Sequence, residues 1–271
     1  MQNEEIHNSE FKSERSELMD MDRRPLIAGN WKMHTTVQEA QQLASALVLA
    51  VAKVAGRDVM IAPPYTALAA VGKILSGTGV MLGAQNVHWE EKGAFTGEIS
   101  AAMLKDVGCV MAIVGHSERR HVFGETDFMI NRRITGALQF GLVPVLCIGE
   151  TLEQREAGQT LKVLEGQVRA GLDGLEAADG SRLVVAYEPV WAIGTGKTAT
   201  EDQAQEAHSF IRNLLADIYE KNIAGQIRIL YGGSVKPENI DILMQQDDID
   251  GALVGGAALN AESFERIICF Q

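Results

Sequence analysis

The sequence predicts an α/β protein that folds as a single (β/α)8 barrel, and three observations lead to this prediction. Eight short apolar runs recur from Pro25 onward. Amphipathic stretches separate the runs, and no shift in composition divides the chain after the first residues. The runs are continuous rather than alternating in polarity, which is typical of parallel strands that are buried on both faces. Eight such β-then-α units favour a closed barrel.

The elements follow from local signals in chain order. The expected strands are Leu26–Asn30, Asp58–Ala62, Val80–Ala84, Val110–Val114, Leu142–Ile148, Leu183–Tyr187, Ile227–Tyr231 and Gly251–Val254. Capping boxes, which mark helix starts, occur at Thr36 with Glu39, at Thr151 with Gln154 and at Thr200 with Gln203. Pro237 suits the first turn of a later helix. An open doubly wound sheet is the alternative, but no GxGxxG motif follows the first strand.

Composition excludes several classes of protein. The 271 residues include 24 basic and 36 acidic side chains, which give a formal charge of −12. This acidity argues against binding to nucleic acid or to an anionic membrane, although it permits a small anionic substrate. The apolar runs are shorter than the ~18 residues that a membrane span needs. Residues 1–22 are acidic and poor in apolar side chains, so we expect a disordered or loosely ordered extension before a barrel domain over 23–271.

The cysteines and histidines predict neither disulfides nor a metal site. Cys109, Cys147 and Cys269 lie far apart without a CxxC pair, and the six histidines are scattered without an HExxH motif. We therefore expect no metal, no cofactor and a reducing, cytoplasmic location.

Candidate functional residues follow the strands, because barrel sites gather where strands end. Asn30 and Lys32 follow the first run; a lysine there is not expected to face the core, because an unpaired buried charge is costly. His116 and Glu118 follow the fourth run, where the histidine can point into the barrel mouth and the glutamate can pair with a base. Glu188 follows the sixth run and is placed to act as a base. Taken singly, Lys32 also fits a solvated loop and His116 a structural role.

The segment after Glu188 predicts a movable lid. It consists of Pro189, Val190, Trp191, Ala192, Ile193, Gly194, Thr195, Gly196 and Lys197. This segment is small, apolar and glycine-containing, and it precedes a capped helix. An ordinary loop is the alternative, but it does not explain an exposed run of Val, Trp, Ala and Ile.

Two glycine pairs predict a phosphate site. Gly232 and Gly233 follow the seventh run and precede Ser234, and Gly255 and Gly256 follow the eighth. Glycines let backbone N–H groups approach an anion closely, and loops after strands seven and eight commonly bind phosphate in barrels. A base, a polar electrophile, a cation and an anion cradle without metal ligands predict proton transfer beside a carbonyl.

These residues lie in segments that closely resemble the triosephosphate isomerase family. The segments are Ala28–Lys32 (AGNWK), Gly83–Ser100 (GAQNVHWEEKGAFTGEIS), Gly115–Arg120 (GHSERR), Val145–Glu150 (VLCIGE), Ala186–Ala199 (AYEPVWAIGTGKTA), Tyr231–Val235 (YGGSV) and Asp250–Ala258 (DGALVGGAA). The resemblance extends from about Arg24 to Gln271 and implies a TIM barrel. It also implies the interconversion of dihydroxyacetone phosphate and D-glyceraldehyde 3-phosphate.

The resemblance implies a role for each candidate. Glu188 is the implied base and His116 the electrophile; this family is the standard example of that pairing, so the roles are carried over from it. Asn30 and Lys32 are implied to bind substrate oxygens, with Glu118 supporting Lys32. The phosphate is implied to accept backbone N–H groups at Gly194, Ser234, Gly255 and Gly256. Pro189–Lys197 is implied to be the mobile lid, for which this family is again the standard example. Glu150 and Trp191 are implied to share a hydrogen bond, and Cys147 is expected to be structural.

The resemblance further implies a homodimer formed through the loop at 85–97. In the family this loop reaches the active-site rim of a second subunit, where the residue at Thr96 contacts the partner's Asn30 and the partner's His116 region. An exposed apolar tip at Ala94-Phe95 would be a liability on a monomer. Two other functions stay open: a different metal-free phosphate-binding barrel, such as a sugar-phosphate isomerase or epimerase, and a non-enzymatic adhesin or regulator.

Overall fold

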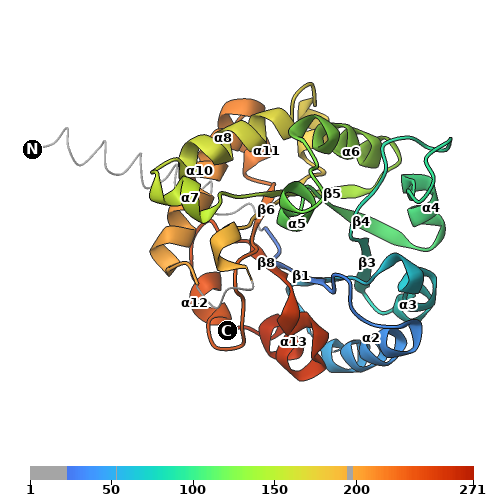
Figure 1. Ribbon diagram of the computed structural model, residues 1–271. Helices are drawn as coiled ribbons and strands as arrows, with labels where there is room; N and C mark the ends of the chain where they lie inside the picture. Colours follow the sequence, from blue (N-terminus) through green and yellow to red (C-terminus); the bar gives the residue numbers. More distant parts are fainter. Residues whose placement is uncertain (1–22, 53, 194–197) are drawn as a thin grey trace, which may run out of the picture.

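A computed structural model describes residues 23–52, 54–193 and 198–271 of the chain. Eight parallel strands close in chain order into a barrel, with β1 paired to both β2 and β8 (Figure 1). This closure rules out the open doubly wound sheet. The expected extension at 1–22 and the lid residues Gly194, Thr195, Gly196 and Lys197 lie outside the described residues.

Each expected strand is present, with bounds that differ from the expectation by no more than one residue. The strands are β1 (Leu26–Asn30), β2 (Asp58–Ala62), β3 (Val80–Ala84), β4 (Cys109–Val114), β5 (Val143–Ile148), β6 (Val184–Tyr187), β7 (Arg228–Tyr231) and β8 (Gly251–Val254). The short strands are buried along nearly their whole length, as continuous apolar runs require.

Helices ring the outside of the barrel, except that the short α5 (Ser117–His121) lies over the ends of the strands (Figure 1). They are α2 (Val37–Val51), α3 (Leu68–Leu75), α4 (Ala101–Asp106), α5, α6 (Asp127–Gln139), α7 (Leu152–Glu156), α8 (Thr160–Gly171), α9 (Ala177–Gly180), α10 (Glu201–Tyr219), α11 (Lys221–Ala224), α12 (Ile240–Met244) and α13 (Ala261–Ile268), with 3₁₀ turns η1 (Tyr65–Ala67), η2 (Val190–Ala192) and η3 (Gly256–Leu259). No helix in the described ranges is both long and apolar enough to cross a membrane.

The helix starts confirm the capping signals and correct one prediction. All three expected capping boxes are formed, at the starts of α2, α7 and α10. The prediction for Pro237 was wrong, because α12 begins only at Ile240. The Asn239 side chain accepts the Lys236 N–H at 2.8 Å, and the Lys236 carbonyl accepts the N–H groups of Asn239 and Ile240. Pro237 therefore lies in a turn that precedes the helix.

The strands divide the apolar residues into two layers, and this division positions the site. Alternate residues of the strands fill the barrel interior, among them Leu26 and Ala28 of β1 and Val184 and Ala186 of β6. The intervening residues pack against the helices. Side chains alternate in direction along a strand, so the next inward position in each strand lies at the barrel mouth. For β6 that position is Glu188.

Candidate active site

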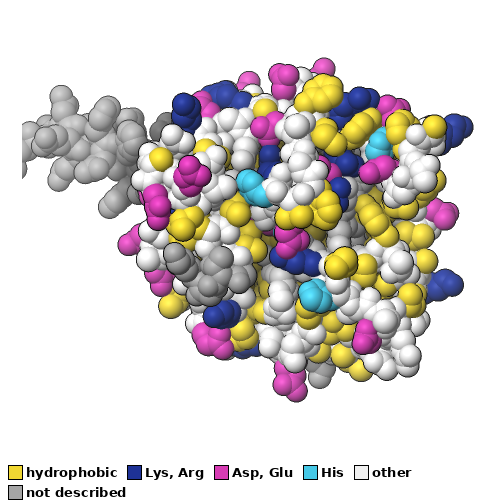
Figure 2. All heavy atoms as spheres, viewed as in Figure 1, with side chains coloured by type: hydrophobic (Ala, Val, Ile, Leu, Met, Phe, Trp, Pro, Cys, Tyr) yellow, Lys and Arg dark blue, Asp and Glu magenta, His cyan; other side chains and the backbone are white. Residues whose placement is uncertain are grey.

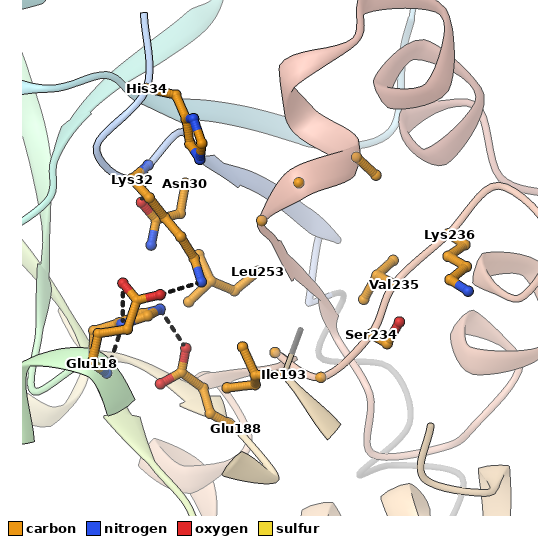
Figure 3. Close-up of a pocket in the computed structure, with 16 residues that line it drawn as sticks. Asn30, Lys32, His34, Glu118, Glu188, Ile193, Ser234, Val235, Lys236 and Leu253 are labelled. Atoms are coloured by element: carbon orange, nitrogen blue, oxygen red, sulfur yellow. Dashed lines mark hydrogen bonds and ion pairs between the residues drawn. The ribbon is translucent and has the colours of Figure 1, made fainter. Parts of the chain in front are cut away.

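A cavity of about 590 Å³ opens at the ends of the strands and collects most of the expected site residues. It is lined by Asn30, Lys32, His34, His116, Glu118, Glu188, Ile193, Gly232, Gly233, Ser234, Val235, Lys236, Leu253, Gly255, Gly256 and Ala257. Basic, acidic and histidine side chains gather around the middle of this face of the molecule (Figure 2). The close-up shows that the cavity has walls from several different loops (Figure 3).

Glu188 lies at the inner end of this cavity and is only 2% exposed. Its Oε2 accepts the backbone N–H of Ser117 at 2.9 Å, and its Oε1 lies 3.1 Å from Nε2 of His116. A methyl group on Gly232 would come within 2.8 Å of the Glu188 Cγ, so a glycine at that position leaves the carboxylate its space. The carboxylate is thus buried but hydrogen-bonded, and it faces the imidazole.

His116 reaches the cavity because Gly115 turns the chain at the end of β4. Gly115 has a φ of +71°, a conformation that favours glycine. His116 then caps α5, with its Nδ1 accepting the N–H of Glu118 at 3.2 Å. In a neutral imidazole that bond leaves the proton on Nε2. The Nε2–H group therefore points toward Glu188 and the cavity.

Lys32 and Glu118 form an ion pair on another wall of the cavity. Their Nζ and Oε1 atoms lie 2.6 Å apart (Figure 3). Partial burial alone would raise the pKa of Glu118, but the hydrogen bond from Lys32 and the positive potential of nearby groups lower the pKa below its usual value. The carboxylate of Glu118 therefore stays ionised beside the ammonium group.

The backbone of Lys32 is held in an unusual conformation. Its φ is +50°, which is uncommon for a residue with a side chain. Its N–H donates to Oδ1 of Asn30 at 3.0 Å, and its carbonyl accepts Nε2 of Gln85 at 2.7 Å. These two bonds fix the turn that carries Lys32 from the end of β1 into the cavity. Sequence reasoning missed Gln85, which follows β3 and reaches across the end of β2, where its Nε2 also donates to the Ala62 carbonyl at 2.9 Å.

The two glycine pairs lie together on the wall of the cavity opposite the Lys32–Glu118 pair, as the sequence predicts. Gly232, Gly233 and Ser234 follow β7, while Gly255 and Gly256 follow β8 at the start of η3. Backbone N–H groups at the start of a helical turn carry partial positive charge. Of the four residues expected to bind phosphate, three line the cavity; Gly194 lies outside the described residues.

A buried carboxylate anchors the first part of the expected lid. Glu150 is fully buried and accepts Nε1 of Trp191 at 2.8 Å, the hydrogen bond that the resemblance implied. It also accepts the Tyr187 hydroxyl at 3.1 Å and Nη1 of Arg155 at 3.0 Å. Ile193 lines the cavity a few residues further on. The described part of the lid segment is therefore tied to the barrel at one end and borders the site at the other.

Five residues of the cavity wall were missed as site residues: His34, Val235, Lys236, Leu253 and Ala257. Leu253 lies at an inward position of β8, and the alternation of side chains along the strand could have predicted this. His34 and Lys236 are exposed loop residues for which no strand-end rule applied. The expected dimer contact, Thr96, is exposed on the 85–97 loop and does not line this cavity.

Cys147 lies in the barrel interior among apolar side chains. Burial raises the pKa of its thiol well above the usual value, and the nearby Glu188 raises it further. Such a thiol is a poor nucleophile, which is consistent with the expected structural role. Across the described ranges, no group of three or more His, Cys, Asp or Glu side chains is arranged to hold a metal ion.

The closed barrel and the acid–base pocket at its mouth define a (β/α)8-barrel enzyme. The family model for triosephosphate isomerase matches residues 25–271. A triosephosphate isomerase of Syntrophotalea carbinolica is 59% identical over 92% of this chain and 99% of its own length. Those of Moorella thermoacetica and Trichlorobacter lovleyi are 56% and 55% identical over the same shares. The chain belongs to the triosephosphate isomerase family.

Proposed function

We propose that Glu188 and His116 carry out the proton transfers of triose phosphate isomerisation in this chain. The reaction is the family's own, the interconversion of dihydroxyacetone phosphate and D-glyceraldehyde 3-phosphate in glycolysis and gluconeogenesis. One observation carries the assignment: the Glu188 carboxylate and the His116 Nε2 lie 3.1 Å apart in a cavity that the glycine pairs also line. A base and a proton donor are thus side by side next to an anion cradle.

In the proposed chemistry, Glu188 transfers protons at carbon and His116 transfers protons at oxygen. The Glu188 carboxylate removes a proton from C1 of dihydroxyacetone phosphate, and the electron pair moves through C2 onto the carbonyl oxygen. The Nε2–H of His116 stabilises that oxygen and passes protons between the two enediolate oxygens. The Glu188 carboxyl group, whose proton exchanges with solvent, then protonates C2, which yields the aldehyde. The hydrogen bond from Glu118 N–H to Nδ1 holds the imidazole in the required tautomer.

The remaining site residues bind substrate in this proposal. Asn30 and Lys32 bind the substrate oxygens, and the Lys32 ammonium offsets the negative charge of the enediolate. Glu118 supports Lys32 through their ion pair. The phosphate accepts backbone N–H groups at Gly194, Ser234, Gly255 and Gly256.

The segment Pro189–Lys197 is proposed to close over the bound substrate. Closure would exclude water and hold the enediolate phosphate against elimination of its phosphate group. The Trp191–Glu150 hydrogen bond at the start of the segment and the position of Ile193 beside the cavity support this role.

We predict that the isomerisation exchanges protons with solvent. In D2O, dihydroxyacetone phosphate converted by the chain and trapped by a coupled dehydrogenase should yield product that carries deuterium at C2. Phosphoglycolate, which resembles the enediolate, should inhibit competitively and bind more tightly than substrate. Mass spectrometry of the trapped product and steady-state kinetics provide the measurements. Product without any solvent deuterium would contradict proton transfer through a carboxyl group that exchanges with solvent, and an inactive chain would contradict the proposal as a whole.

We also propose that the chain forms a homodimer through the 85–97 loop. A cavity of about 300 Å³ adjoins the active site and shares Asn30, Lys32, His116 and Glu118 with it. Its rim carries the exposed side chains of Met33 and Phe123, which are 94% and 67% exposed. Such an apolar rim is costly in water, and a protruding loop from a second copy would cover it. The loop offers Phe95, which is 41% exposed, next to Thr96.

The dimer prediction can be tested by molecular mass. Sedimentation at micromolar concentration should give twice the chain mass of 29.4 kDa. Phe95→Glu should shift the mass toward the monomer and lower activity, because a charge would enter the apolar contact. Leu49→Glu is the matched control, since Leu49 is 80% exposed on α2, away from this rim. A monomer with full activity would contradict the proposal.

We propose a reducing, cytoplasmic location. All three cysteines are free thiols; Cys109 and Cys147 are buried and Cys269 is exposed. Chains in oxidising compartments commonly pair such residues.

A further inference from the structure

Among the described residues that line the active-site cavity, one lysine has no acidic partner. Lys32 is neutralised locally by Glu118, because the two side chains form a 2.6 Å ion pair. Glu188, as a carboxylate base, adds a negative charge. Lys236 is the one other lysine or arginine among the lining residues, and within the described ranges it forms no ion pair.

The charge of the cavity wall matters for a substrate that carries a phosphate dianion. The chain has a formal charge of −12, so the protein as a whole repels such a substrate at long range. On the described cavity wall, the side chains of Lys32, Glu118 and Glu188 together carry one net negative charge. Lys236 brings the sum of these charges to zero, and it places a positive charge at the end of the cavity away from Glu118 and Glu188.

The backbone around Lys236 is held so that the residue stays on the rim. Its N–H donates to Oδ1 of Asn239 at 2.8 Å, and Nδ2 of Asn239 donates to the carbonyl of Ser234 at 2.9 Å. One asparagine thus links the rim lysine to the cradle residue Ser234. Figure 3 shows Lys236, Val235 and Ser234 on the side of the cavity opposite the Lys32–Glu118 pair.

We propose that Lys236 is a positioning residue for the isomerisation, which attracts the phosphate dianion to the cradle end of the cavity. Its positive charge attracts the substrate electrostatically as the substrate approaches the rim, and it takes no part in the proton transfers. The substrate then enters with its phosphate toward Ser234 and its carbonyl toward Glu188 and His116. The proposal rests on the proposed function, because it needs the dianion to bind at the cradle.

The test compares Lys236→Gln with the unmodified chain at two ionic strengths. At about 10 mM ionic strength we expect kcat/KM to fall about fivefold, with kcat unchanged within about twofold. At about 0.3 M the difference should disappear, because salt screens a charge that acts at a distance. Lys236→Arg should restore the low-salt kcat/KM, since it restores the charge.

The matched control is Lys221→Gln. Lys221 is an exposed lysine on α11, which precedes β7 and so lies at the other end of the barrel. It changes the net charge equally but should leave kcat/KM unaltered. Equal kcat/KM values for Lys236→Gln and the unmodified chain at low salt would overturn the proposal. A loss that persists at high salt, or that appears in kcat, would also overturn it. Absence of isomerase activity in the unmodified chain would instead contradict the proposed function.

Discussion

Replacing Glu188 with aspartate is expected to lower the turnover number several hundred-fold, about 3–4 kcal/mol of barrier. The substitution keeps the carboxylate but shortens the side chain by one methylene. The carboxylate is held at both oxygens, by the Ser117 N–H at 2.9 Å and by His116 Nε2 at 3.1 Å. An aspartate at the end of β6 cannot reach both partners and the substrate carbon together. Steady-state kinetics with glyceraldehyde 3-phosphate in a coupled assay measures the loss.

The fold should tolerate this substitution, which makes the kinetic result interpretable. The thermal unfolding temperature should change little, because only one methylene is lost from a side chain that lines a cavity, and the carboxylate can still accept a hydrogen bond. Glu165→Asp provides the control, since Glu165 is a half-buried residue of α8 that pairs with Arg169, away from the cavity. It should have normal kinetics. Near-normal turnover in Glu188→Asp would remove Glu188 from the role of base.

The sequence could predict which residues reach the barrel mouth, because strand alternation continues past the strand ends. In β1 the inward residues are Leu26 and Ala28, so Asn30 and Lys32 follow on the same side. In β6 the same rule leads to Glu188. These predictions needed only a period of two and the position where each apolar run stops.

The contacts that hold these side chains could not be predicted in the same way. Periodicity states which face a residue occupies, but not which distant residue packs beside it. The Ser117 N–H on Glu188 and the Gln85 amide on the Lys32 carbonyl both join segments that are far apart in the chain. Such pairs depend on the register between strands and on loop conformation. The left-handed turn at Lys32 is likewise a product of its neighbours rather than of its own residue type.

The second large effect concerns His116, whose imidazole has two separable tasks. Its Nδ1 caps α5 by accepting the Glu118 N–H, while its Nε2 faces Glu188. Asparagine is among the best helix-capping residues, so His116→Asn should keep the cap. It cannot, however, pass a proton between two oxygens as an imidazole can. We therefore expect a fall in kcat of about 100-fold or more, with the free energy of unfolding nearly unchanged.

A comparison with His116→Ala separates the two tasks. Alanine removes the cap as well as the imidazole, so this variant should also lose about 1 kcal/mol of stability in urea unfolding. His121→Asn is the matched control, because His121 is exposed at the end of the same helix. It should leave both kinetics and stability unchanged. If His116→Asn retained most of its activity, the capping role alone would account for His116, and the proton transfers between the enediolate oxygens would need another donor.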